Sequence, residues 1–528
     1  MNLFRKKDIA HLAQDAEKSG FVRNLTAFDL VFLGIGSVIG TGIFVLTGVG
    51  AALYAGPGIA ISFVLASVAC AFAGLAYAEY SSMVPVSGSA YAYTYASLGE
   101  FMAFLVGWNL ILEYTVTCST VAAGWSGYVV GLLTSGGLNL SIDFLKVPAE
   151  GGIINLPAVF ITMFLCILLV RGTKESIFIN RILVFVKIAV IFIFLCLAIP
   201  NIDVRNWDPF LPFGYQGIAS GAAIVFFAYI GFDAVATSAE EAKNPSRDVP
   251  IGILGSLAVC TLLYFIVAMV LTGIVPYTQL NNAEPVAYAL RVIGYPFGSA
   301  IVAVGAICGI TTVLLVLLYG QARVFFALSR DGMIPKEICR VHKKYHTPYL
   351  VTIGGCILVS LIAGFVPINV IAEMANIGTL SAFFIAGFGV LYLRITRPEI
   401  KRGFKCPAIY IVGPMAMLSC GYLMYNLPAL TWIRFIIWCI VGIIIYFVFC
   451  FINGFTGGFG ICLGQKCGAK DEKGMRKSVA VSTLLSIAFT VVLTLICCLL
   501  AHQILRWMQI PSDISGEAYD YMFVVLLG

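Results

Sequence analysis

The stretch GIGSVIGTGIF at residues 34–44 places four glycines within nine residues of a long apolar run. Each glycine weakens a helix by about 1 kcal/mol relative to alanine. One interpretation of the pattern is close packing of membrane helices, which small residues permit. The other is an unwound stretch, whose freed N–H and C=O groups could surround a ligand.

The composition of the whole chain shows what surrounds this stretch. Of the 528 residues, 60% are hydrophobic and only 11% are charged, and the mean hydropathy is +0.98. Soluble domains carry about 25% charged residues. The composition therefore excludes a soluble enzyme and a disordered chain. Because the apolar runs are long and continuous, they argue against a membrane β-barrel, and we expect an all-α polytopic membrane protein.

Apolar runs of about 20 residues predict the membrane spans. Twelve are expected up to residue 452, and one extra C-terminal helix follows. The predicted spans lie in 30–78 (two helices), 101–142, 151–170, 176–200, 216–240, 249–276, 292–322, 348–366, 374–393, 409–427, 432–452 and 478–505.

The distribution of positive charge predicts the orientation. With the N-terminus inside, 21 Lys and Arg residues of the twelve-helix core and its tail face the cytoplasm, and four face the other side. Positive residues stay in the cytoplasm. We therefore expect a cytoplasmic N-terminal tail at 1–26, a twelve-helix membrane domain at 27–452 and a separate C-terminal piece at 453–528.

A second interruption is expected in helix six, where residues 226–233 read FFAYIGFD after Gly217 and Gly221. A carboxylate such as Asp233 costs about 3 kcal/mol at the bilayer centre, so it indicates a buried polar site. Helices one and six occupy equivalent places in two five-helix halves. Paired interruptions of this kind indicate a transporter with inverted repeats and a site at the midplane.

The chemistry of the two predicted breaks favours a zwitterion. The half-helix that begins near Gly40, Thr41 and Gly42 would present N–H groups and a positive dipole end, which suit a carboxylate. Carbonyls freed by the breaks suit an ammonium group. An α-amino acid carries both groups close together.

Several long motifs in order resemble one family. Residues 35–48 resemble the first helix of amino acid–polyamine–organocation permeases, and 226–233 with 240–250 look like their helix six and its cytoplasmic exit. GQAR at 320–323, SRDG at 329–332 and residues 394–407 resemble the cationic amino acid transporter branch and its bacterial relatives. The resemblance covers about residues 20–452.

The resemblance implies a set of substrate-binding residues. The substrate carboxylate would meet the N–H groups of Gly40, Thr41 and Gly42. The amine would meet carbonyls of Val38, Phe227 and Ile230, and Ala228 lies within the same segment. The Phe227 ring would close over the substrate, although the sequence alone favours a lipid-facing or packing aromatic at this position.

Lys187 lies well inside predicted helix five. A buried ammonium without a partner tends to lose its proton, whereas a lysine near the cytoplasmic end could extend to the interface. In related proton-coupled permeases, a lysine in helix five takes the place of a coupling sodium ion. The resemblance therefore implies proton coupling at Lys187, with Thr311 or Thr312 of helix eight as a possible neighbour.

Two carboxylates lie inside predicted spans, Glu113 in helix three and Asp233 in helix six. Each could be satisfied locally by hydroxyl groups or the helix-six region. Each could instead be a counter-charge for a cationic side chain or a second proton carrier. They leave both cationic and small neutral amino acids as expected substrates.

The C-terminal region does not match a permease. Residues 454–460, 464–477 and 504–519 resemble the end of helix two, the loop and helix three of the multidrug and toxin extrusion family. The resemblance covers about 452–528, a small part of that family's twelve helices. We expect a fusion or a truncated join between two transporters, with an accessory helix as the other interpretation.

These observations predict a secondary active transporter of the plasma membrane, not an enzyme, that moves cationic (arginine or lysine) or small neutral amino acids with protons. Apart from the proton, no cofactor and no metal are expected. The expected partners are the amino acid and the lipid bilayer, without nucleic acid or an obligate protein. The alternatives are a non-transporting amino-acid sensor and a defective fusion product of a permease and a drug exporter.

Overall fold

The computed structural model describes residues 25–83, 89–138, 141–171, 177–237, 242–334, 347–400 and 402–507, together with Arg340 and His342. Every longer regular element in these ranges is a helix, and an isolated bridge pairs Leu25 with Ala242. The predicted all-α fold is confirmed. The predicted tail at 1–26 lies outside the described residues except for Leu25 and Thr26.

The first part of the chain contains predicted helices one to five, with helix one in several pieces. The elements are α2 (Ala27–Val38), η1 (Gly42–Leu46), α3 (Thr47–Gly50), η2 (Ala51–Ala55), η3 (Gly56–Gly58), α4 (Ile59–Met83), α5 (Ser89–Ser97), α6 (Glu100–Ser135), η4 (Ile142–Phe144), η5 (Pro148–Glu150), α7 (Leu156–Arg171), α8 (Ile177–Ala198), η6 (Ile199–Asn201) and η7 (Val204–Trp207).

The second part contains predicted helices six to thirteen, with helix six again in pieces. The elements are α9 (Gly214–Val225), η8 (Phe226–Tyr229), α10 (Asp233–Thr237), α11 (Pro245–Ile274), η10 (Tyr277–Gln279), α12 (Pro285–Val292), α13 (Pro296–Arg330), α14 (Tyr349–Phe365), α15 (Ile368–Thr396), α16 (Ile409–Tyr425), α17 (Ala429–Gly468) and α18 (Glu472–Trp507). The short helices α5 and α12 were not among the predicted elements.

Among the residues that the structure describes, seven helical segments are long and apolar enough to cross a membrane. They are Gly42–Met83, Glu100–Ser135, Val184–Asn201, Pro245–Ile274, Pro296–Ser329, Ile368–Thr396 and Ala429–Phe451. Shorter apolar helices cover Ala27–Val38, Leu156–Arg171, Tyr349–Phe365 and Ile409–Tyr425. Helix one contributes to both groups because it is interrupted. The helices are those of a polytopic membrane protein.

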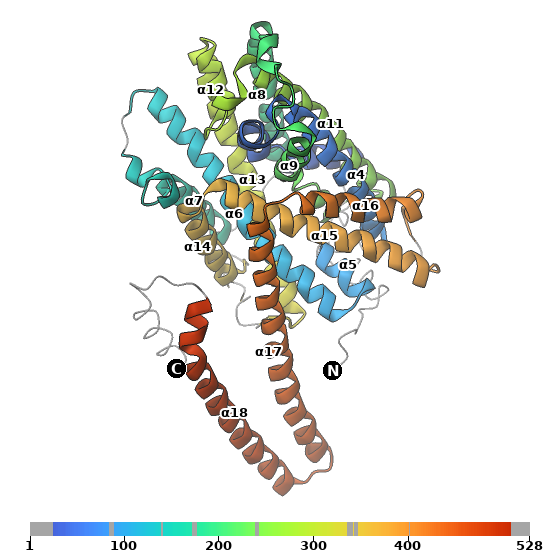
Figure 1. Ribbon diagram of the computed structural model, residues 1–528. Coiled ribbons are helices and arrows are strands. Elements are labelled where there is room, and N and C mark those ends of the chain that lie inside the picture. The colour runs from blue at the N-terminus through green and yellow to red at the C-terminus, as the bar shows by residue number, and fades with distance from the viewer. Residues whose placement is uncertain are drawn as a thin grey trace. The chain divides into compact units, whose positions relative to one another are not determined.

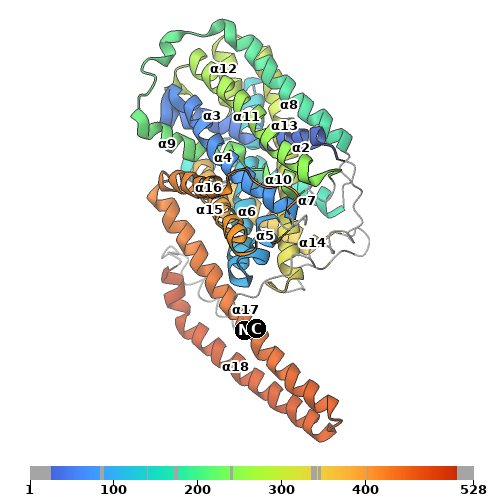
Figure 2. The same cartoon turned by 90° about the vertical axis from the view of Figure 1, so that its right-hand side faces the viewer.

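The helices α2 to α16 gather in one bundle (Figures 1 and 2). Its centre is built by α6, which packs against α13 and α15, and by α11, which packs against α2 and α4. A Cβ atom at Gly34 of α2 would overlap the side chain of Ser256 in α11. The packing interpretation of the glycine-rich stretch is therefore correct at Gly34, before the helix breaks.

The end of α4 is fixed by a buried carboxylate, Glu79. It accepts hydrogen bonds from Arg394 Nη2 (2.6 Å) and Arg402 Nε (3.0 Å), and from the backbone N–H of Cys406 (2.8 Å). The Glu79 side chain is fully buried, and that of Arg402 is 2% exposed. Because two guanidinium groups and an amide satisfy it, the charge can remain inside the protein and ties α4 to the segment between α15 and α16.

The chain divides into two compact units, one up to Tyr446 and one from Phe447 onward. In the described part of the second unit, the end of α17 and α18 form a helical hairpin (Figure 1). Its turn contains Lys470 with φ 54° and Asp471, whose carboxylate accepts the N–H of Gly474 at 2.9 Å. The boundary at 452/453 stays a prediction.

Candidate functional site

The first predicted break lies in helix one. The helix α2 ends at Val38, and Ile39 has extended dihedrals (φ −74°, ψ 104°). After Gly40 and Thr41 the chain resumes as η1, a π-helix. A π-helix is rare and is often found at functional sites. The break is buried on all sides, so its polar groups need partners from other helices.

The second predicted break lies in helix six. After α9 the chain passes through η8, a 3₁₀-helix, to Ile230 in an extended conformation (φ −61°, ψ 132°). Gly231 then has φ 115°, a value at which a side chain would be strained. The helix resumes as α10 at Asp233. The prediction of broken helices one and six is confirmed.

The two breaks touch each other. Ser37 Oγ donates a hydrogen bond to the carbonyl oxygen of Gly231 at 2.9 Å. A Cβ atom at Gly231 would stand 2.9 Å from the Ser37 carbonyl oxygen, and one at Gly42 would overlap the Cα of Ala228. The glycines therefore allow the backbones of helix one and helix six to meet directly.

The hydroxyl of Tyr264, from α11, connects both breaks. It lies 3.0 Å from the carbonyl oxygen of Val38 and 2.9 Å from that of Ala228. A phenol has one proton to donate. It therefore cannot satisfy both carbonyls fully at once, and one of them retains capacity for another donor.

Lys187, from α8, reaches the same region from a third side. Its Nζ donates to the carbonyl oxygen of Gly36 at 2.7 Å, and the residue is 1% exposed. Its ammonium is thus held inside the protein and does not extend to an interface. Within the described ranges, Lys187 forms no salt bridge. Its aliphatic part packs on Gly309 of α13, where a Cβ would stand 3.0 Å from Lys187 Cγ.

Thr311 and Thr312 make their hydrogen bonds elsewhere. Thr311 Oγ1 donates to its own helix at the carbonyl of Ile307 (2.7 Å) and accepts from Trp125 Nε1 (2.9 Å). Thr312 Oγ1 donates to the carbonyl of Gly309 at 2.8 Å. Their role as neighbours of Lys187 stays a prediction.

The predicted substrate residues meet where the two breaks cross. Thr41 Oγ1 is buried without a hydrogen-bond partner among the described residues, and its side chain packs against Gly124 of α6. The carbonyl of Phe227 accepts from the N–H of Ile230 at 3.1 Å, so part of its capacity is used within helix six. Val38, Gly40, Gly42 and Ala228 complete the crossing. Their substrate roles stay a prediction.

The two intramembrane carboxylates lie near one another. Glu113 is 4% exposed and Asp233 is 6% exposed. They interact electrostatically with each other and with Tyr77, and Glu113 also lies by Thr379. This surrounding fits local satisfaction by hydroxyl groups. It equally provides a negative pole close to the helix-six break.

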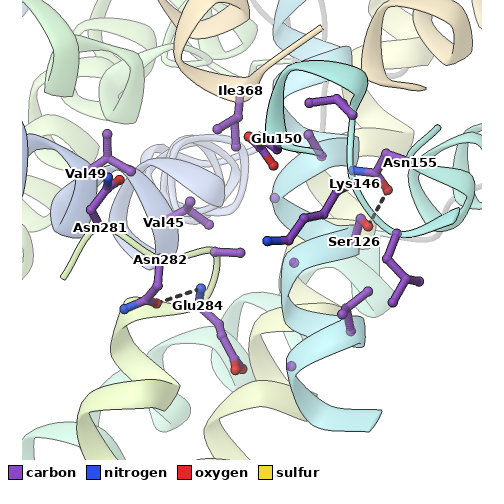
Figure 3. A pocket seen from close by; sticks show the side chains of 18 of the residues that line it. Val45, Val49, Ser126, Lys146, Glu150, Asn155, Asn281, Asn282, Glu284 and Ile368 are labelled. Carbon is purple, nitrogen blue, oxygen red and sulfur yellow. Dashed lines mark hydrogen bonds between the residues drawn. The ribbon is translucent and has the colours of Figure 1, made fainter. Parts of the chain in front are cut away.

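A pocket of about 710 Å³ lies at the C-terminal end of α6, and we call it the α6 pocket. Figure 3 shows side chains from α6, from the 142–155 region and from the segment before α12 around it. Val45 and Val49, which follow the break in helix one, line it, as does Gly124, against which Thr41 packs. The pocket therefore borders the crossing of the two breaks.

Sequence reasoning missed the groups that satisfy the freed carbonyls. Besides Tyr264 and Ser37, Asn376 of α15 donates to the carbonyls of Ala223 (2.8 Å) and Ile224 (3.0 Å) at the end of α9. Tyr128 of α6 donates to the carbonyl of Phe44 in the π-helix at 2.8 Å. An intramembrane asparagine or tyrosine is a weak signal, because many such residues serve packing alone.

Comparison with known proteins agrees with this architecture. The family model described as amino acid permease matches residues 25–459, and the MatE family model matches residues 439–528. The resemblance seen in each part of the sequence is thus confirmed.

Three curated relatives illustrate the similarity. The methylthioribose transporter of Bacillus subtilis is 46% identical over 85% of this chain and 98% of its own. The branched-chain amino acid permease BcaP of the same organism is 48% identical over 85% and 97%. Cationic amino acid transporter 9 of Arabidopsis thaliana is 40% identical over 71% and 67%. The chain belongs to the amino acid permease family, and it is a multi-pass membrane transporter and not an enzyme.

Proposed function

We propose that this permease imports amino acids across the cell membrane together with protons and binds them where the breaks in helices one and six cross. The amino and carboxylate groups would both be held by backbone. The first N–H groups of the half-helix from Gly40 to Gly42 have no partner within that helix and favour an anion. The carbonyls of Val38 and Ala228 compete for one Tyr264 proton, which favours an added ammonium donor.

The observation that carries proton coupling is the hydrogen bond from Lys187 to Gly36. The Lys187 Nζ lies against a carbonyl of helix one directly before the break, which agrees with the resemblance to permeases in which such a lysine replaces a coupling sodium ion. A lysine side chain can lose a proton and regain it, whereas a bound metal ion cannot. Loss of the proton would leave a neutral amine, whose hydrogen bond to the Gly36 carbonyl is weaker than that of the ammonium, and would so couple protonation to the helix-one break. Sodium coupling is therefore not proposed.

Small and branched neutral amino acids are the main substrates we propose. The side chains of Val38, Phe227 and Ile230 at the crossing are apolar, and one relative at 48% identity is named a branched-chain amino acid permease. Cationic amino acids are the second candidate, favoured by the carboxylates of Glu113 and Asp233 beside Tyr77. Methylthioribose belongs in the test because another relative is named for it.

We also propose that the N-terminus faces the cytoplasm, which puts the α6 pocket on the outer side. This orientation is supported by the 21 positive residues on one side of the predicted core and its tail against four on the other. Cysteine labelling at exposed loop positions of the intact cell would test it. Labelling of an added cysteine beside Lys405 from outside would overturn it.

The central experiment is uptake into proteoliposomes with an acidic exterior. The panel contains labelled leucine, alanine, arginine, lysine and methylthioribose, in sodium chloride or choline chloride. We expect accumulation of leucine or alanine that a protonophore abolishes and that does not require sodium. Lys187→Ala should lose gradient-driven accumulation but retain exchange of labelled for unlabelled substrate. Lys405→Ala, which removes an exposed lysine, is the matched control. Unchanged driven uptake by Lys187→Ala would overturn the proton role.

The C-terminal piece is proposed to take no part in transport. The helix α17 has 40 residues and would be about 60 Å long, whereas a bilayer core is about 30 Å thick. Its apolar span ends at Phe451. A chain ending at Phe451 should transport at least as well as the full chain. Binding without uptake by either form would favour a sensor, and activity in the short form alone would indicate a damaging join.

A further inference from the structure

One acidic side chain that lines the α6 pocket lacks part of its hydrogen bonding. Glu284 precedes α12, lines the pocket and has a side chain only 10% exposed. Its Oε1 accepts a hydrogen bond from Arg291 Nη2. Its Oε2 is buried and has no hydrogen-bond partner within the described part of the chain. A buried carboxylate oxygen without a donor is costly, so this atom needs an explanation.

Arg291 does not fully neutralise the carboxylate. The guanidinium also donates to Ser299 Oγ at 3.2 Å, and it is 26% exposed, so it is shared between two acceptors and solvent. Burial raises the pKa of the Glu284 carboxyl above its usual value, against the opposing effect of Arg291. The charged form would therefore gain from a further positive donor.

A second acceptor of the pocket has the same character. Asn369, at the start of α15, lines the pocket, and its Oδ1 is buried without a partner among the described residues. Each of these two unsatisfied acceptors calls for a donor from within the pocket. An ammonium group provides three such donors and a positive charge.

The pocket also contains an opposite pole and an apolar wall. Lys146 lines it, and Figure 3 shows its side chain pointing into the pocket on the side of Val45 and Asn282. An exposed ammonium at this position suits a carboxylate. Val45 and Val49 contribute apolar surface to the same lining. The lining thus matches the parts of a neutral amino acid.

The space at Glu284 is created by Gly131 of α6. A Cβ atom at this glycine would overlap the Glu284 carboxyl group. Because glycine stands here, the carboxylate can lie against α6 and face the pocket. This close approach fixes the acceptor independently of the helix breaks.

We propose that the α6 pocket is a second amino acid site, in which Glu284 holds the ammonium group and Lys146 the carboxylate, before the solute reaches the helix breaks. The inference rests on amino acids being the substrates of the proposed function. It adds a binding site that the crossing of the breaks does not require.

The test is equilibrium binding to the full-length protein in detergent, with labelled leucine, alanine and lysine as probes. The unmodified protein should bind about two equivalents of at least one probe. Glu284→Gln, which removes charge and retains shape, should leave about one equivalent. Glu399→Gln removes the same charge from an exposed position outside the pocket lining and should leave two. Gly42→Ala obstructs the crossing of the two breaks. This variant should still bind one equivalent of probe, at the site that depends on Glu284.

Displacement measurements distinguish an amino acid from a simple cation as the ligand of the second site. Isoamylamine, which lacks the carboxylate, should displace leucine weakly from the second site, and 4-methylpentanoate, which lacks the amine, should not displace it. Displacement of the Glu284-dependent equivalent by sodium chloride but not by choline chloride would show a cation site and overturn the proposal. If Glu284→Gln is not monodisperse, Lys146→Ala, at an exposed position of the lining, should weaken the same equivalent at least fivefold.

Failure of the second site can be distinguished from failure of the proposed function. One equivalent that Glu284→Gln and Lys146→Ala leave unchanged would overturn the second site alone. No binding of any probe, with no uptake of the panel, would overturn the proposed function as well.

Discussion

The hydroxyl of Tyr264 lies 3.0 Å from the carbonyl oxygen of Val38 and 2.9 Å from that of Ala228. One side chain from α11 therefore bridges the interrupted backbones of helix one and helix six. Because it has a single proton for two acceptors, it holds the breaks together while it leaves room for a ligand donor.

Tyr264→Phe should keep the aromatic ring and remove the bridge. Loss of one buried hydrogen bond of about 1.4 kcal/mol would change affinity about tenfold. We expect the KM for leucine uptake to rise by about this factor, with the amount of protein in the membrane unchanged. Tyr422→Phe, an exposed phenol in α16, is the control. Equal KM values for both variants would contradict a role for the bridge.

Gly42→Ala should abolish transport, because its Cβ would overlap the backbone of Ala228, which cannot move aside as a flexible side chain could. Gly354→Ala is a matched control, since a Cβ at Gly354 of α14 meets nothing within 4 Å. Uptake should be near background in the first variant and normal in the second. Normal uptake by Gly42→Ala would show that helices one and six do not need this approach.

Glu79→Ala should destabilise the protein strongly. The substitution leaves the guanidinium of Arg402 buried without its carboxylate, and breaking such a pair costs about 3–5 kcal/mol. We expect a clear fall in the thermal unfolding midpoint in detergent micelles. Glu399→Ala removes an exposed carboxylate and should change the midpoint little. Similar midpoints for both variants would show that the Glu79 contacts do not hold α4.

The two helix interruptions and the buried lysine could be predicted from the sequence, because each departs from what is usual for residues in a membrane helix. Glycines at 34–42 weaken a helix, Asp233 is costly in a membrane, and Lys187 is a lone charge in an apolar run. Each signal lies within a few residues of the feature it indicates. The packing and unwinding interpretations of the glycines then both proved correct, at Gly34 and at Gly40 respectively.

The partners of these features could not be predicted, because they come from distant parts of the chain. Tyr264 lies 226 positions from Val38, and Lys187 lies 151 positions from Gly36. A tyrosine in a span is also a good packing residue, so nothing local marks its hydroxyl. The short helix α12 and Glu284 before it were missed because one polar residue in a loop has no periodic signal.

Thr41→Val separates a substrate contact from a structural one. The Thr41 hydroxyl is buried and has no partner among the described residues, so it contributes no hydrogen bond to the folded chain. Replacement by an apolar group of the same shape should leave the unfolding midpoint unchanged or slightly raised, because an unsatisfied polar group is removed. If the hydroxyl binds substrate, leucine affinity should fall about tenfold. A lower midpoint with normal affinity would instead assign Thr41 to the packing of helix one on α6.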